Sequence, residues 1–122
     1  LTKFDRTVRL EECRSYRDLY LRLYSAGATE LREIKGAFRS KGANSFENYI
    51  YAYSRGVVVK ITKLNRDGKG LTAEEDLQLD VFCYGISYMY KKWVMGEYPM
   101  SADEAADALF ALMPATLRDY WV

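Results

Sequence analysis

The segment between Thr72 and Gly96 constrains the fold of this chain more than any other part of its sequence. Apolar residues recur there every three or four positions, which predicts a long helix over about residues 72–95. They cover more than one side of that helix, as Leu77, Val81, Phe82, Tyr84, Ile86, Tyr88, Met89, Trp93 and Val94. A helix that is apolar most of the way round is buried on several sides, so other helices must pack against it.

The same spacing predicts the remaining elements. The expected helices cover residues 15–26, 29–42, 45–64 and 101–113, followed by a short terminal turn at 115–121. We expect the first of them to end near Gly27 and the second to end at Gly42. The run Val57–Val59 could pass for a strand, but helical spacing continues on both sides of it. The sequence therefore predicts an all-α bundle of about five to six helices.

Side chains that cap helices support these starts. Four candidate N-caps precede the apolar runs: Thr29, Ser45, Thr72 and Ser101. Glu75 and Glu104 lie three residues after two of these positions, and each completes a capping box. The acidic pairs Glu74–Glu75 and Asp103–Glu104 could be imagined as catalytic carboxylates. Both lie in the first turn of a helix, where the helix dipole favours acids, so we interpret them as structural.

Length and charge limit the function classes. A chain of 122 residues fits one domain, and its formal net charge of +1 provides no large positive field for holding a nucleic-acid backbone. Cys13 and Cys83 lie in separate apolar stretches, which indicates free buried thiols in a reducing cytoplasm. We find no apolar run long enough to span a membrane and no signal peptide, so we expect a cytoplasmic protein. Because the chain begins with Leu1, we also expect a further N-terminal part.

The absence of histidine removes most catalytic and metal chemistry from consideration. No histidine occurs in the sequence, so Ser-His-Asp triads, Cys-His pairs and His-rich metal sites are excluded. We expect no enzyme activity, no cofactor and no metal. Asn65, Asp67, Gly70 and Asp76 match positions 1, 3, 6 and 12 of a calcium-binding EF-hand loop. Lys69 stands at position 5, where an oxygen ligand is required, so we interpret the segment as a solvated loop between helices.

Aromatic residues are the unusual feature of the composition. The chain contains 11 tyrosines and 2 tryptophans. Buried phenols need hydrogen-bond partners and often line pockets that are part apolar and part polar. Tyrosines at helical spacing also simply fill a core, with their hydroxyls at its rim. The residues alone leave both interpretations open.

Two stretches near the C-terminus resemble a known family. The segment from Phe82 to Gly96 has an aromatic residue, a mid-helix glycine and a Trp93 one turn before the terminal glycine. The following segment, 99–109, contains the start of a helix capped by Ser101. This pattern resembles the last two long helices of the C-terminal domain of TetR-type transcription regulators, most of all the branch that regulates dihydroxyacetone kinase operons. With the Gly42–Phe46 junction, the resemblance spans most of the chain from about residue 15.

The resemblance implies a homodimer built from a four-helix bundle, to which each subunit contributes its last two long helices. It also implies a cavity for a small-molecule effector among the middle helices, and DNA binding only through an N-terminal helix-turn-helix head that this chain lacks. Gly85 supports the dimer independently, because a glycine inside a helix costs about 1 kcal/mol relative to alanine and suggests that another backbone approaches.

Combining the geometry that the resemblance implies with the helical phase, we assign residues to each surface. The predicted dimer interface is Phe82, Gly85, Ile86, Met89, Trp93, Leu109 and Leu112. The predicted effector-binding residues are Tyr20, Tyr24, Tyr49, Tyr53, Val57, Tyr84 and Tyr88. The alternative is a helical adaptor that binds a partner protein and holds no small molecule. An enclosed pocket of about 300 Å³ or more would favour the sensor, and a filled core with an exposed aromatic groove would favour the adaptor.

Overall fold

The computed structural model describes residues 12–39 and 45–121 of the chain. Its elements are α2 (Tyr16–Thr29), α3 (Leu31–Arg39), α4 (Ser45–Asn65), α5 (Ala73–Val94), α6 (Ala102–Ala111), α7 (Ala115–Arg118) and the 3₁₀ helix η2 (Asp119–Trp121). No strand occurs in the described part, and the Val57–Val59 run is helical. The prediction of an all-α bundle is confirmed. None of the helices described is both long enough and apolar enough to cross a membrane.

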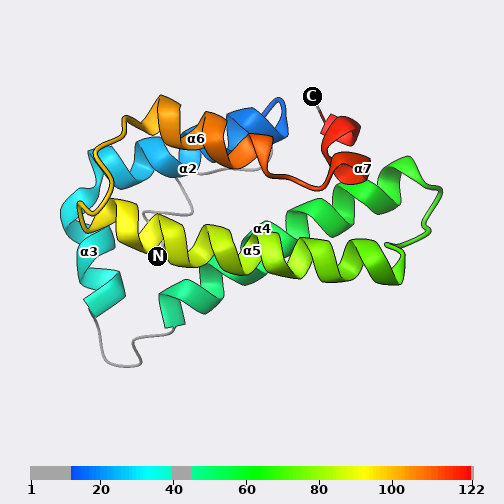
Figure 1. The fold of residues 1–122 in the computed structure, drawn as a ribbon, viewed down its shortest axis with the longest axis horizontal. Helices are drawn as coiled ribbons and strands as arrows, with labels where there is room; N and C mark the ends of the chain where they lie inside the picture. The colour runs from blue at the N-terminus through cyan, green and yellow to red at the C-terminus, as the bar shows by residue number, and fades with distance from the viewer. Residues whose placement is uncertain (1–11, 40–44, 122) are drawn as a thin grey trace.

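The helices form two layers (Figure 1). One layer consists of α2 and α6, which pack against each other, and the other consists of α4 and α5. Helix α3 lies at one end, where it contacts α2, α4 and α5. The C-terminal elements α7 and η2 lie at the opposite end, and η2 contacts α4. The two layers bury their side chains against each other, so the core of the domain is the seam between them.

Capping side chains begin three of the helices. The Ser15 hydroxyl accepts a hydrogen bond from the Asp18 amide at 3.0 Å. Both predicted capping boxes are confirmed: the Thr72 and Ser101 hydroxyls accept from the third residue of their helices, and the glutamate there accepts from the cap's own amide. These bonds satisfy amides at the helix start that have no carbonyl partner within the helix.

The predicted end of the first helix is wrong. α2 continues through Gly27 to Thr29, so Thr29 closes this helix and does not cap the next one. Gly27 does not end the helix. It allows α5 to pack closely against α2, because a Cβ atom there would lie 2.8 Å from the Tyr90 hydroxyl and 2.9 Å from the Trp93 ring. The expected end at Gly42 lies outside the described residues.

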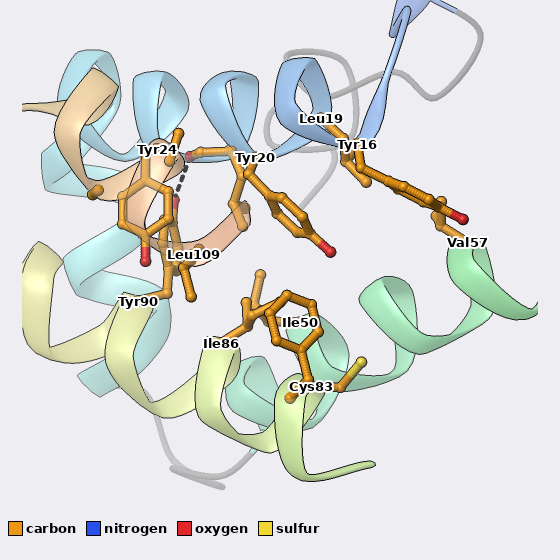
Figure 2. Packing of buried hydrophobic residues seen from close by; sticks show 14 of the residues in the cluster. Tyr16, Leu19, Tyr20, Tyr24, Ile50, Val57, Cys83, Ile86, Tyr90 and Leu109 are labelled. Atoms are coloured by element: carbon orange, nitrogen blue, oxygen red, sulfur yellow. Dashed lines mark hydrogen bonds between the residues drawn. The ribbon is translucent and has the colours of Figure 1, made fainter. Parts of the chain in front are cut away.

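Tyrosine rings fill the seam between the layers. Tyr16, Tyr20 and Tyr24 project from α2 toward the α4–α5 layer, as Figure 2 shows. Tyr20 meets Phe82 of α5 edge-on, with ring centroids 5.9 Å apart. Tyr24 meets Tyr90 edge-on at 5.2 Å. Edge-to-face pairs of this kind stabilise a core beyond the area that they bury.

A buried ion pair fastens the C-terminal end to the α4–α5 hairpin. Arg66, just after α4, donates to both carboxylate oxygens of Glu75 at 2.7 Å each and to the Tyr120 hydroxyl at 2.7 Å. The Thr116 hydroxyl of α7 donates to the same carboxylate at 2.6 Å. Glu75 is buried, so its charge needs this complete set of partners.

Candidate functional site

An apolar groove of about 650 Å³ lies between α5 and the segment formed by α6 and α7. Large aliphatic side chains stand open to solvent beside it: Leu77 and Val81 are each 67% exposed, and Leu112 is 72% exposed. Monomeric soluble domains seldom expose contiguous apolar surface of this kind. The groove is therefore a candidate surface for contact with another protein chain.

Six of the seven residues predicted for a dimer interface line this groove: Phe82, Gly85, Ile86, Met89, Leu109 and Leu112. Phe82 and Ile86 form its floor, since both are buried within the protomer. At Gly85 an added Cβ atom would meet nothing within 4 Å, so the glycine leaves open space on this face. The structure brings these residues together on one surface, and their role in dimerisation stays a prediction.

Trp93, the seventh residue predicted for the interface, does not line this groove. Its ring packs edge-on against Tyr24 of α2 with centroids 4.8 Å apart, and its indole N–H donates to the Met100 carbonyl at 2.9 Å. Trp93 thus packs against the core on the α2 side of α5. Helical spacing alone could not tell whether Trp93 packs in the core or faces the groove, because α5 is apolar on both of these sides.

Five of the seven residues predicted for an effector pocket lie in the core or pack against it. Tyr20, Tyr24 and Val57 are buried, while Tyr49 and Tyr53 are half-buried and stack on each other along α4 with centroids 6.2 Å apart. All five lie on α2 or α4.

The expectation that Tyr84 and Tyr88 face inward is wrong, because they are 58% and 57% exposed. They continue the outward stripe of Leu77 and Val81, which the sequence analysis did not assign to any surface. The spacing of these four residues along α5, by four, three and four positions, was the signal that could have grouped them.

The interior holds far less space than an effector cavity of the expected size. A void of about 10 Å³ lies between α2 and α4, lined in part by Tyr20, Tyr53 and Ser54. That volume is at most enough for one water molecule. The expected enclosed pocket is therefore absent from this part of the described structure.

Two tyrosine hydroxyls at the seam are buried without a hydrogen-bond partner among the described residues. Tyr16 and Tyr20 are both 0% exposed, and neither hydroxyl has such a partner. Burial raises the pKa of each well above the ordinary value of a tyrosine, so both hydroxyls keep their protons. By contrast, the Tyr90 hydroxyl donates to the Leu23 carbonyl at 3.0 Å (Figure 2).

A second open surface follows α4 from Tyr51 to Gly68, with a volume of about 920 Å³. Three basic residues line it: Arg55, Lys60 and Lys63. Arg55 is paired there with Asp76 and Asp80 of α5, and the Asp80 carboxylate also accepts from the Tyr51 hydroxyl at 2.6 Å. The acids offset the positive charge, so the surface does not resemble a nucleic-acid groove.

Groups suited to metal binding or nucleophilic chemistry are scarce. Among residues 12–39 and 45–121, no three His, Cys, Asp or Glu side chains are grouped closely enough to hold a metal ion. Both cysteines are buried thiols, as predicted. Burial raises the pKa of the Cys83 thiol to about 12, so it carries almost no thiolate at neutral pH.

Comparison with known proteins identifies the family of this all-helical domain. A family model of the TetR type, described as the transcriptional regulator C-terminal region, matches residues 15–115. The chain belongs to this TetR family. The matched region of the TetR-type domain contains helices α2 to α6 and therefore both layers of the core. No curated protein and no solved structure gave a significant match to it.

Proposed function

We propose that this TetR-type domain is the dimerisation and regulatory part of a cytoplasmic bacterial transcription regulator, whose DNA is bound by an N-terminal helix-turn-helix head. The groove between α5 and α6 is the observation that carries the proposal. It lies on the two helices that form the dimer bundle in the resemblance to the family. Two copies related by a two-fold axis bury the same patch on each other, which fits one self-complementary apolar surface per protomer.

The exposed side chains supply the driving force for this association. Leu77, Val81 and Leu112 are more than half exposed in the protomer, and covering them removes apolar surface from water. Gly85 lets a partner helix approach the backbone of α5 closely, since no atom of its own protomer fills the space at its Cβ position. A four-helix bundle formed by two protomers would bury the exposed aliphatic side chains and fill the open space at Gly85.

The regulatory step in this proposal is the binding of a small-molecule effector, which changes the spacing of two DNA-binding heads. The proposal includes membership of the branch that regulates dihydroxyacetone kinase operons, on the pattern from Phe82 to Gly96. The described residues support regulation more than catalysis, because they contain no histidine and their one thiol with a resolved pKa shift, Cys83, is held protonated.

Sedimentation of the 122-residue chain with a matched pair of leucine variants tests the dimer. Leu112 and Leu64 are 72% and 71% exposed, but only Leu112 lines the α5–α6 groove. We expect a dimer at tens of micromolar, and a monomer after Leu112→Glu because a charge would be buried without a partner. Leu64→Glu should leave the dimer intact. A wild-type monomer at this concentration, or equal effects of the two changes, would contradict the proposal.

A second variant separates association from folding. Gly85→Leu should weaken dimerisation by about 1–3 kcal/mol through overpacking against the partner. Its folding should not suffer, because the Cβ position of Gly85 is open and leucine favours helix more than glycine does. Thermal unfolding of the monomeric fraction provides that check.

The adaptor remains the second candidate, because two observations favour it. The core void is about 10 Å³, and Tyr84 and Tyr88 are exposed beside the aliphatic groove. An adaptor would use this face for a different protein, so the chain alone would stay monomeric in sedimentation. Sedimentation of the wild-type chain therefore decides between the two functions, and the leucine pair then locates the interface of a dimer.

A further inference from the structure

The seam between the two layers contains hydrogen-bonding capacity that the described residues do not use. The hydroxyls of Tyr16 and Tyr20 are fully buried and unpartnered, and so is the hydroxyl of Thr62 on α4. Buried hydroxyls almost always find a partner, because desolvation without one is costly. Tyr16 and Tyr20 lie one turn apart on α2, and both hydroxyls lack a hydrogen-bond partner at the same seam. This arrangement indicates a site at which a further molecule supplies the partner.

The chemistry of the seam selects the kind of molecule. Glu75 is the one buried side chain of the described residues that is charged at neutral pH, and Arg66 already pairs with it. An ionic ligand at Tyr16 and Tyr20 would therefore lose its hydration without gaining a counter-charge. Both hydroxyls keep their protons because burial raises their pKa, so they act as donors to an acceptor oxygen. Most of the surrounding side chains are apolar or aromatic, as Figure 2 shows for Ile50, Val57 and Ile86, and Ser54 adds a neutral hydroxyl.

We propose that the effector of this regulator is a neutral, largely apolar molecule with an acceptor oxygen, which binds in the seam and is held by the hydroxyls of Tyr16 and Tyr20. This inference rests on the proposed function and names the ligand class of its regulatory step. Because the existing void is about 10 Å³, the molecule enters by separating the layers. Helix α2 packs mainly against α6, and α4 packs mainly against α5, so the layers can shift with each helix pair intact.

The position of the seam couples it to the dimer surface. Helix α6 belongs to one layer and α5 to the other, and the apolar groove is lined by residues of both. A molecule that widens the seam therefore moves Leu109 of α6 and Leu112 at its C-cap relative to Gly85 and Met89 of α5. The ligand changes dimer geometry without touching the groove, which is the requirement for coupling between two separate sites.

The first test compares hydroxyl deletions that keep the ring. Tyr16→Phe and Tyr20→Phe should leave the melting temperature unchanged or raise it, because each removes a buried group without a partner. Tyr90→Phe is the matched control and should lower it by roughly 3–6 °C, since its hydroxyl is bonded to the Leu23 carbonyl. Equal losses in all three variants would show that Tyr16 and Tyr20 are already satisfied, which overturns the proposal.

The second test uses three probes that share a ring and differ in one group: acetophenone, isopropylbenzene and benzoate. Millimolar acetophenone should raise the melting temperature by a few degrees, isopropylbenzene by less, and benzoate not at all. The double variant Tyr16→Phe/Tyr20→Phe should lose the advantage of acetophenone over isopropylbenzene. Stabilisation by benzoate, or no response to acetophenone, overturns the proposal.

Sedimentation with and without acetophenone measures the coupling. We expect the dimer dissociation constant to change at least five-fold in the wild type and to stay constant in the double variant. A stabilising probe that leaves the dissociation constant unchanged overturns the coupling between seam and groove. Dimerisation without any probe is measured separately, so failure of the ligand site and failure of the proposed function give different results.

Discussion

At the residue scale, Glu75 shows how one buried carboxylate is kept charged. Its two oxygens accept from Arg66, and further bonds come from the Thr116 hydroxyl and the Thr72 amide. Arg66 is the main cause, with Thr116 next, and together they hold the pKa of Glu75 far below its usual range. The same carboxylate caps the start of α5 and accepts a hydrogen bond from Thr116 of α7. Its charge therefore stabilises both the α4–α5 connection and the C-terminal end of the domain.

Glu75→Gln should make the free energy of unfolding less dependent on pH in the acid range. Unfolded glutamate has a pKa of about 4.3, and a lowered folded pKa adds stability above that value. The contribution is lost as the pH falls below about 5, toward the lower folded pKa. Urea unfolding between pH 7 and pH 3 should therefore show the wild type more stable near neutrality and the gap narrowing in acid. Glu74→Gln, an exposed change in the same turn, controls for lost charge, and a gap independent of pH would contradict the assignment.

At the element scale, glycines with similar helical positions have different functions. Gly27 lies inside α2 where α5 crosses it, and a Cβ atom would come within 3 Å of Tyr90 and Trp93. Gly36 lies on the exposed side of α3, where a Cβ atom would meet nothing within 4 Å. Only the first glycine is required by packing.

Alanine at these two positions should therefore have opposite effects. Gly27→Ala should destabilise the domain by about 1–3 kcal/mol, because the Tyr90 and Trp93 rings must move away. Gly36→Ala should stabilise it by up to about 1 kcal/mol through the better helix propensity of alanine. Thermal or urea unfolding of the two single variants measures both. Stabilisation by Gly27→Ala would show that α2 and α5 do not approach as closely as described.

At the scale of the whole molecule, two helix layers share one seam and one outer apolar groove. The groove combines residues from both layers, so it exists only when α6 is docked on α2 and α5 on α4. Folding of the protomer and formation of the dimer surface are therefore linked. Association then adds stability by mass action, because the partner binds the folded state alone.

The melting temperature of the wild type should consequently rise with protein concentration. A hundred-fold increase should raise it by roughly 5 °C for a domain of this size. Leu112→Glu should remove the dependence, and Leu64→Glu should retain it. Scanning calorimetry at several concentrations measures the slope. A wild-type melting temperature independent of concentration would argue against a dimer coupled to folding.

The sequence by itself determined the helical class, the approximate helix ranges and the capping boxes at Thr72 and Ser101, because periodicity and capping act within a few residues of each other. It also carried the family pattern between Phe82 and Gly96. It did not determine which apolar side of α5 faces the core, since Phe82 and Ile86 are four positions apart, as are Tyr84 and Tyr88, and both stripes have helical periodicity.

Only the tertiary structure decided that question, by placing α2 on the Phe82 side and leaving Tyr84 and Tyr88 in solvent. The same is true of Gly27, whose place in a helix depends on where Tyr90 crosses it. The unpartnered hydroxyls of Tyr16 and Tyr20 also depend on contacts across the seam. Such features come from packing between segments far apart in the chain, and local residue preferences carry no information about them.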